Sequence, residues 1–182
     1  GSGRGWHDRV PGAEAQGRLR DDTGVEMQVG GCVVCLVPRS SGGSELNYDA
    51  VIDVTIASGE VCPSTAWVYA LWTAHMWLIA EYPESIQREV FSSPNPLASS
   101  CVSTTGVPVR VDGGYRWTGR GLFSRGVDHC DCLITARLPP HADAPTDRRC
   151  CLRRSGDLTT CDTRSPLAPT APDPPAHAAP HP

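Results

Sequence analysis

The chain has 182 residues, a hydrophobic content of 40% and a formal net charge of −4 at pH 7. This acidic balance lacks the basic stripe of a nucleic-acid-binding protein, so we expect no nucleic-acid partner. No apolar run reaches the roughly 18 residues that a membrane-spanning helix requires, and no segment near the start has the pattern of a secretory signal. The nine cysteines are an odd number, which argues against a disulfide scaffold. We therefore expect a cytoplasmic protein that makes no contact with a membrane.

Proline is unevenly distributed, because ten of the 17 prolines lie in residues 139–182. This proline-, alanine- and arginine-rich segment lacks apolar periodicity and cannot offset its ordering entropy by burial, so we expect a disordered tail. A GC-rich reading frame shifted by one base would read similarly, and we hypothesise that the tail is not the natural continuation of the domain. The predicted organisation is a ragged N-terminus at 1–17, a helical domain at 18–93, a partial β-domain at 94–138 and the tail.

A short helix is expected directly after Arg20. Asp21, Asp22 or Thr23 can cap its start, and Gly30-Gly31 supplies the stop. The β-branched run CVVCLVP at 32–38 follows, and we expect a strand or an extended crossing segment there.

Three further helices are expected before residue 94. The first covers 48–61 after an Asn47 cap, and the second extends from a Ser64 cap to about Ala80. Pro83 is expected at the first position of the third, PESIQREVF, where its fixed φ suits a helix start. One face of the helix at 48–61 consists of Tyr48, Val51, Ile52, Thr55 and Ile56.

Strand patterns replace the helical periodicity after residue 96. VPVRV at 107–111 alternates, and Asp112-Gly113-Gly114 separates it from the next strand-like run. Glycine accepts the positive φ that a tight hairpin turn needs, so this is a strong hairpin signal. YRWTGRGLF at 115–123 and DCLITARL at 131–138 are expected to be strands. The sequence therefore predicts an α+β chain in which helices precede strands.

His75 is the single histidine of the apolar run, and Trp67 lies eight residues earlier on broadly the same side of the helix. A histidine in such a helix is more often a satisfied core residue, and Trp67, Trp72 and Trp77 are equally typical of a core. The alternative is a pocket that buries an aromatic substrate or cofactor and orients it with one polar group. Both interpretations stay open at this point.

Hydroxyl residues gather in LASSCVSTTG at 97–106. Hydroxyls and backbone N–H groups beside a glycine can line the polar edge of a cofactor, although a plain turn is the simpler interpretation. Ser124, in GLFSRG, leaves the same two alternatives open. The cluster comprises Ser99, Ser100, Ser103, Thr104, Thr105 and Gly106.

The run Asp128-His129-Cys130-Asp131-Cys132 is dense in metal-ligand types. A structural zinc site, however, needs four ligands in paired short-loop spacings. Within a strand, Cys130 and Cys132 would share one face while His129 and Asp131 take the other, so we expect no metal. The sequence also lacks the GxSxG, Walker, GxGxxG and HExxH motifs.

The chain resembles the oxygenase component of two-component, flavin-dependent aromatic monooxygenases in the order of its motifs: CPSTAW, an aromatic-rich helix with one histidine, QREVF, LASSCVSTTG, VDGGYRWTG and FSRGVDHCD. The hydroxyphenylacetate hydroxylases and secosteroid phenol hydroxylases are of this type. The resemblance covers residues 18–138 and implies an acyl-CoA dehydrogenase-like fold. Of that fold this chain would hold the N-terminal helical domain and part of the middle β-domain, without the C-terminal helical bundle that completes the family's site and homotetramer.

The resemblance also implies a reaction. Reduced FMN or FAD, supplied by a separate flavin reductase, would react with oxygen to a C4a-hydroperoxide that hydroxylates a phenolic or aromatic substrate. Trp67 would wall the flavin and substrate cavity, and His75 would bond or deprotonate the phenol. Ser124 would hydrogen-bond the flavin near N5, and Ser100 and Thr105 would line its edge. These roles require Trp67, His75 and Ser124 to face one common hollow.

The chain departs from the family's pattern in three places. Thr104-Thr105-Gly106 stands where the family usually has Pro-Thr-Gly, and Arg125 replaces a usual second serine. The C-terminal bundle is missing together with its flavin contacts and second histidine. The alternatives are therefore, from another functional class, a non-catalytic fragment or interaction module of this fold and, as a second alternative, an acyl-CoA dehydrogenase.

Overall fold

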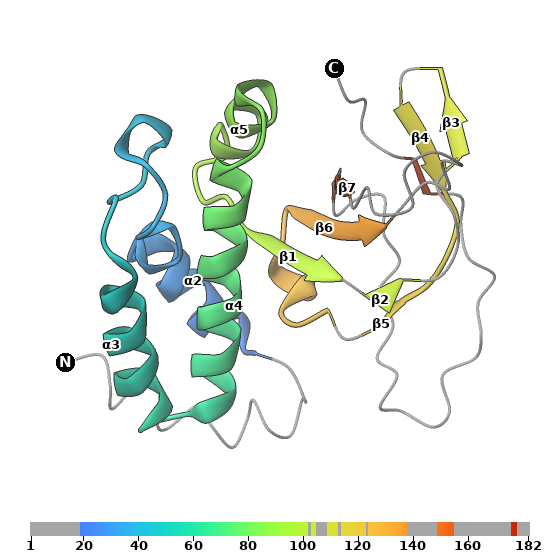
Figure 1. The fold of residues 1–182 in the computed structure, drawn as a ribbon. Helices are drawn as coiled ribbons and strands as arrows, with labels where there is room; N and C mark the ends of the chain where they lie inside the picture. The colour runs from blue at the N-terminus through green and yellow to red at the C-terminus, as the bar shows by residue number, and fades with distance from the viewer. Residues whose placement is uncertain are drawn as a thin grey trace, which may run out of the picture. The chain divides into compact units, whose positions relative to one another are not determined.

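The structure is a computed structural model, and it describes residues 19–101, 103–104, 109–112, 114–122, 124–137, 149–154 and 176–177. The chain divides into two compact units, Gly1–Ala98 and Ser99–Pro182. The described part of the first unit is helical, and that of the second consists mainly of short strands (Figure 1). The predicted order of helices before strands is thus confirmed. None of the described helices has both the length and the apolar character that crossing a bilayer requires.

The helical unit is built around α4, which lies beside α3 (Figure 1). Its described elements are α2 (Asp21–Val29), the 3-10 helices η1 (Cys32–Val34) and η2 (Arg39–Ser41), α3 (Tyr48–Gly59), α4 (Pro63–Ala80) and α5 (Glu84–Phe91). All four predicted helices are therefore present.

Buried positions of α4 recur every three or four residues, which is the spacing of one helix face. These positions are Thr65, Ala66, Tyr69, Trp72, Thr73, Met76 and Ile79. Met27 of α2, Val33 of η1, Val37 and Leu97 are also buried. Each fully buried aliphatic or aromatic side chain contributes about 1.5–3 kcal/mol, so this core carries much of the unit's stability.

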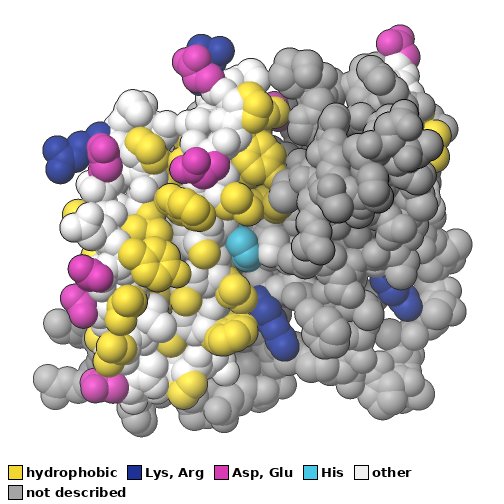
Figure 2. All heavy atoms as spheres, in the orientation of Figure 1, with side chains coloured by type: hydrophobic (Ala, Val, Ile, Leu, Met, Phe, Trp, Pro, Cys, Tyr) yellow, Lys and Arg dark blue, Asp and Glu magenta, His cyan; other side chains and the backbone are white. Residues whose placement is uncertain are grey.

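The apolar face expected on α3 is buried at one position and exposed at others. Val51 is 3% exposed, whereas Tyr48, Ile52 and Ile56 are 58%, 47% and 59% exposed. Figure 2 shows hydrophobic side chains gathered over the surface of the helical unit. The apolar spacing therefore predicted the helix correctly, but the chain itself covers little of that face.

The start of α2 differs from the predicted cap. Arg20 occupies the capping position, and it makes no side-chain capping hydrogen bond. Its guanidinium pairs instead with the Asp22 carboxylate, with 3.1 Å between Nη2 and Oδ2. Capping by Asp21, Asp22 or Thr23 is therefore wrong, whereas Gly30-Gly31 ends the helix as predicted.

Two other helix starts also shift, that of α4 by two residues and that of α5 by one. Pro63, not a residue after a Ser64 cap, is the first residue of α4, because proline lacks the N–H that a helix start would leave unsatisfied. Pro83 occupies the cap of α5, which begins at Glu84. Asn47 lies at the cap of α3 as expected, without a side-chain capping hydrogen bond.

The run at 32–38 is neither a strand nor an extended segment, so that prediction is wrong. Val33, Cys35 and Val37 are buried in alternation, which is the pattern that a strand would give. The backbone is nevertheless satisfied locally, because the N–H groups of Cys35 and Val37 donate to carbonyls three residues earlier at 3.4 and 3.1 Å. Only Cys32–Val34 is 3-10 helix, and the residues after it form a turn, so alternate burial in this run does not reflect a strand.

Gln87 closes the corner between α4 and α5. Its Nε2 donates to the carbonyl oxygens of Ala80 and Tyr82 at 2.8 and 2.7 Å. Its Oε1 accepts a hydrogen bond of 3.3 Å from the Ser41 hydroxyl. Carbonyls in the last turn of a helix lack intrahelical partners, so a side chain of α5 satisfies the end of α4.

The β unit contains three small sheets, with strand orders β1-β6-β7, β2-β5 and β3-β4-β8 among the described residues. The strands are β1 (Ala98–Cys101), β2 (Ser103–Thr104), β3 (Val109–Val111), β4 (Gly114–Trp117), β5 (Gly121–Leu122), β6 (Cys132–Arg137), β7 (Arg149–Arg154) and β8 (Ala176–His177). A 3-10 helix, η3 (Val127–His129), precedes β6. The predicted hairpin is confirmed, because β3 and β4 pair antiparallel with Val111 opposite Gly114.

Other strand predictions need correction. The run at 115–123 is not one strand, because it divides between β4 and β5, which belong to different sheets. Within the tail, the residues of β7 pair antiparallel with β6 and those of β8 pair with β4, which differs from the disorder expected there. Backbone pairing needs no apolar periodicity, so composition gave no sign of it. The other tail residues and the N-terminal 1–17 lie outside the described residues.

Candidate functional site

His75 lies in the second half of α4, and its side chain is half-buried. Burial lowers the pKa of His75 below the ordinary 6.5, and a hydrogen bond to the backbone of Ala98 acts in the opposite direction. Both residues belong to the helical unit. The imidazole is therefore neutral near pH 7, which is the state in which it can accept a proton.

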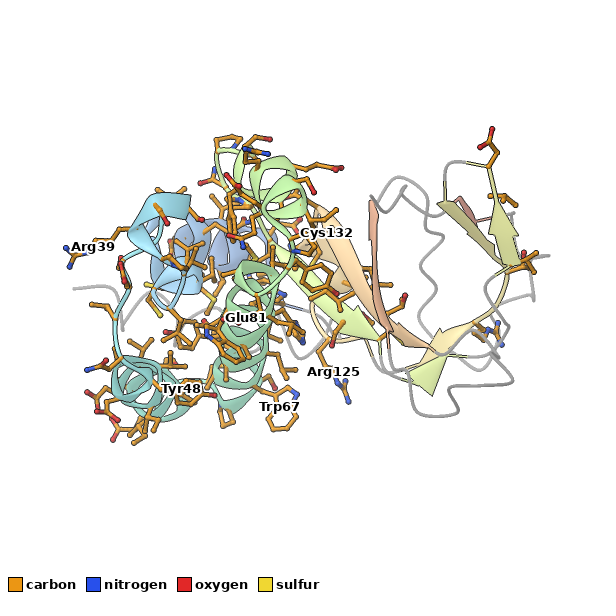
Figure 3. The ribbon with its side chains drawn as sticks, turned by 45° about the horizontal axis from the view of Figure 1, so that its top comes forward. Arg39, Tyr48, Trp67, Glu81, Arg125 and Cys132 are labelled. Carbon is orange, nitrogen blue, oxygen red and sulfur yellow. The ribbon has the colours of Figure 1, made fainter. Side chains whose placement is uncertain are left out.

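The three tryptophans of α4 have different surroundings. Trp72 is 0% exposed and is a core residue, whereas Trp67 and Trp77 are 61% and 47% exposed. Figure 3 shows the indole of Trp67 extending outward from α4. An exposed indole is a flat apolar surface on which a planar ring can stack. The core interpretation therefore holds for Trp72 and fails for the other two.

Ser99 and Ser124 meet within the β unit. Ser99, in β1, is 0% exposed, and its Oγ lies 3.1 Å from the Oγ of Ser124. The same Ser99 hydroxyl donates a hydrogen bond of 2.8 Å to the carbonyl of Arg125. Ser124 is half-buried, just before the turn that leads into η3. The sequence singled out each serine separately, but it gave no sign that the two are in contact.

The rest of the hydroxyl cluster is strand rather than turn. Ser100 is half-buried in β1, and Ser103 and Thr104 form β2, which pairs with β5. The simple-turn interpretation is therefore wrong for these residues. Thr105 and Gly106 lie outside the described residues.

The run from Asp128 to Cys132 is not a continuous strand. Asp128 and His129 lie in η3, and the buried Cys130 donates a hydrogen bond of 3.1 Å from Sγ to the carbonyl of Gly126. The alternating faces expected for this run are therefore wrong, because only Cys132 belongs to a strand. Across the described residues, no three histidine, cysteine or acidic side chains are gathered as a metal site would require.

Tyr69 and Cys35 form a second pair of titratable groups in the helical unit. The tyrosine Oη and the cysteine Sγ are 3.8 Å apart. Burial raises the pKa of both groups, which keeps the phenol and the thiol protonated near neutral pH. This pair is therefore a core contact and not a nucleophile with its base.

The predicted site residues are divided between the two units. Trp67 and His75 belong to Gly1–Ala98, and Ser100 and Ser124 belong to Ser99–Pro182. Their convergence on one hollow, and their roles toward flavin and substrate, stay predictions.

A depression in the helical unit was not expected from the sequence. Its lining comes from α2, the two 3-10 helices, the end of α5 and the Pro94–Pro96 turn. Gln28 closes one side by donating a hydrogen bond of 3.3 Å to the carbonyl of Asn95. The depression contains none of the predicted site residues, so we do not assign flavin or substrate binding to it.

Comparison with known proteins shows that the chain is similar to hydroxylases and to oxygenase components of flavin-dependent monooxygenases. It is 33% identical over 120 residues to a pigment production hydroxylase of Rhodococcus erythropolis, which covers 65% of this chain and 30% of that protein. Over 108 residues it is 37% identical to the oxygenase component of an FADH(2)-dependent resorcinol hydroxylase of a Rhizobium species, covering 58% and 26%. The chain thus spans about a third or less of the length of these curated relatives. No known family profile matches the sequence.

Solved structures of flavin-dependent oxygenases are also similar to the chain. The HsaA monooxygenase of Mycobacterium tuberculosis superposes with a TM-score of 0.78 at 27% identity, covering 86% of this chain and 41% of that one. XiaF from a Streptomyces species, in complex with FADH2 and glycerol, superposes with a TM-score of 0.84 at 26% identity, covering 98% and 47%. The predicted acyl-CoA dehydrogenase-like fold and the resemblance to flavin-dependent oxygenase components are confirmed.

Proposed function

From this relationship to the oxygenase components of flavin-dependent monooxygenases, we propose that the chain takes part in hydroxylating a phenolic or aromatic substrate with dioxygen and a reduced flavin. The observation that supports this proposal is that both the sequence and the fold of the chain are similar to those of hydroxylases and monooxygenases. One of the similar structures is a complex with FADH2. The route of oxygen transfer expected from the sequence is part of this proposal.

The residues of each unit suit a flavin. In the helical unit, the exposed indole of Trp67 offers a planar surface for stacking. In the β unit, the half-buried hydroxyl of Ser124 offers a hydrogen-bonding group for the N5 edge of the ring. Ser100 and Thr105 would line the polar edge of the same ring. When bound, reduced flavin supplies electrons and activates dioxygen.

His75 would act on the substrate. Because burial keeps its imidazole neutral near pH 7, one ring nitrogen can accept the proton of a phenol hydroxyl. Loss of that proton increases the electron density of the aromatic ring, which favours attack by an electrophilic oxygen. The hydrogen bond to the backbone of Ala98 would hold the ring in orientation while the proton moves.

The other parts of the proposal concern partners. A separate flavin reductase would supply reduced FMN or FAD, as the two-component systems require. Cys32, Cys35, Cys62, Cys101, Cys130 and Cys132 are free thiols, which suits a reducing cytoplasm. Assembly into a homotetramer is also part of the proposal.

A second candidate is a non-catalytic module that binds a flavin or a protein without turnover. The observation that favours it is the apolar face of α3, where Tyr48, Ile52 and Ile56 are 58%, 47% and 59% exposed, as on a surface that a protein partner covers. Acyl-CoA dehydrogenase chemistry has less support, since the relatives named above are hydroxylases and monooxygenases.

The test mixes the purified chain with reduced FMN or FAD under nitrogen and then adds oxygen with resorcinol as the phenolic probe. We expect a hydroxylated product by mass spectrometry, with one oxygen atom from labelled dioxygen. His75→Gln is expected to reduce the product about a hundredfold, as for loss of a general base, while flavin binding is kept. Flavin binding without any product would support the non-catalytic module. Absence of both flavin binding and product would contradict the oxygenase and leave only a module that binds a protein.

A further inference from the structure

The hydroxyl of Ser99 has two neighbours and one proton. Arg125 presents a carbonyl oxygen at 2.8 Å, and a carbonyl can only accept. The proton of Ser99 is therefore committed to Arg125. The contact of 3.1 Å with Ser124 must then use the proton of Ser124, which points to the Oγ of Ser99. Ser124 is left with lone pairs and no free proton.

The backbone around this contact is fixed on both sides. Ser99 is 0% exposed in β1, which pairs with β6 in one sheet. Beyond Arg125, Gly126 takes a left-handed φ of 68°, which favours glycine. The carbonyl of Gly126 accepts a hydrogen bond of 3.1 Å from the buried Cys130 thiol. Consecutive carbonyls of the turn are thus held by Ser99 and Cys130, so the position of Ser124 is set from the interior of the unit.

We propose that Ser99 is a positioning residue that makes Ser124 a hydrogen-bond acceptor, and that this selects reduced over oxidised flavin. The inference rests on the proposed function, in which Ser124 faces the N5 edge. Reduced flavin carries a hydrogen on N5 and donates, whereas oxidised flavin has a lone pair there and accepts. A hydroxyl that can only accept forms a hydrogen bond with the N5–H of reduced flavin, and it repels the N5 lone pair of oxidised flavin.

The consequence for catalysis is the exchange of cofactor. If a reduced flavin were bound with its N5 edge at Ser124, the lone pairs of Ser124 would accept from its N5–H. Toward oxidised flavin the same lone pairs would face another lone pair, so the contact would favour release. Ser99 therefore acts through Ser124 and need not touch the flavin.

The experiment measures affinity rather than turnover. The full chain is titrated anaerobically with dithionite-reduced FMN and, separately, with oxidised FMN, and tryptophan fluorescence reports binding; FAD is tested in the same way. Ser99→Ala frees the proton of Ser124, which can then donate to oxidised flavin while its lone pairs still accept from reduced flavin. The ratio of the two dissociation constants, oxidised over reduced, is therefore expected to fall about tenfold, the value of the one hydrogen bond that oxidised flavin gains. Ser99→Thr keeps the hydroxyl on a strand that suits a β-branched residue, and should restore the ratio.

Two further variants complete the design. Ser58→Ala removes another buried serine hydroxyl, which donates to the Val54 carbonyl at 2.6 Å in α3, and it should leave the ratio unchanged. Ser124→Ala should abolish the preference for reduced flavin, and adding Ser99→Ala to it should change nothing more. Circular dichroism of each variant checks that it is folded.

The outcomes separate this inference from the proposed function. If the unaltered chain binds neither form of FMN or FAD, the proposed function fails and the inference fails with it. If it binds reduced flavin and Ser99→Ala keeps the ratio, or if Ser124→Ala keeps the preference, flavin binding stands and the role of Ser99 is overturned.

Discussion

The helical unit and the β unit differ in their largest buried side chains and in the groups to which their buried hydroxyls bond. Among the described residues, the helical unit buries two large aromatic side chains and two methionines completely, including Tyr69 and Trp72 of α4. Its buried Ser58 and Thr73 hydroxyls donate to carbonyls of their own helix, whereas the buried Ser99 of the β unit donates to the carbonyl of Arg125, 26 residues away. Apolar burial is not directional, whereas a hydrogen bond fixes both distance and angle.

The helical unit therefore contributes mainly to the stability of the fold, and the β unit mainly to the exact position of one side chain. The helical unit can lose an exposed tryptophan without losing its core, because the buried face of α4 continues beneath it. The β unit has fewer large side chains to bury, and its polar contacts determine where Ser124 lies. We therefore expect substitutions in the first unit to change mainly the free energy of unfolding, and those around Ser99 to change mainly the geometry of binding.

The largest expected effect is at Trp72. Trp72→Ala removes a side chain that is 0% exposed, so the free energy of unfolding of the helical unit should fall by about 3–5 kcal/mol. Urea unfolding followed by far-ultraviolet circular dichroism measures it. The matched control is Trp77→Ala on the same helix, where a 47% exposed side chain should cost about 1 kcal/mol or less. Equal losses in the two variants would contradict the core described for α4.

A smaller effect is expected in the β unit at Ile134, which is 3% exposed in β6. Ile134→Val removes one methylene group and should destabilise β6 by about 1 kcal/mol. Faster amide hydrogen exchange in residues 132–137 is the measurement. Val109→Ala, at a 61% exposed position of β3, should leave that exchange unchanged. Insensitivity of β6 to Ile134→Val would mean that apolar burial contributes nothing measurable there.

His75 should give the helical unit a pH dependence. Because burial lowers its folded pKa below 6.5, the unfolded state binds a proton more readily as the pH falls through 6.5, and stability declines until the folded pKa is passed. His75→Gln keeps a donor for the Ala98 backbone but does not titrate, so this decline should disappear. Urea unfolding at a series of pH values tests it. If the decline in stability at low pH persisted in His75→Gln and disappeared in His129→Gln, the prediction would be wrong and the effect would belong to the β unit.

The smallest effect is expected at the surface pair of α5. The Arg88 Nη1 and Glu84 Oε1 atoms are 3.0 Å apart, and both side chains are more than 70% exposed. Arg88→Ala should therefore cost only about 0.3–0.5 kcal/mol, and the cost should diminish in high salt. Thermal unfolding at two salt concentrations measures this, and a loss of more than 1 kcal/mol would show that α5 depends on charge rather than on packing.

Local signals in the sequence predicted local structure well. Apolar spacing, capping residues, glycine stops and proline together predicted all four helices, and Asp112 with its following glycines predicted the β3–β4 hairpin. The run at 32–38 was misread because its β-branched composition suits a strand, whereas its backbone bonds locally through a 3-10 helix and a turn. The Ser99–Ser124 contact joins residues 25 apart, and no periodicity or turn motif encodes such a pairing. Motif order predicted the relationship to flavin oxygenases, because it depends on residue identities rather than on contacts.

The side-chain amide of Gln87 has a mechanical consequence. It binds the carbonyls of Ala80, the last residue of α4, and of Tyr82, with bonds of 2.8 and 2.7 Å, while its backbone belongs to α5. A tilt of α5 away from α4 would lengthen both bonds, so they oppose such a tilt. The end of the helix that carries Trp67 and His75 is thereby tethered to α5.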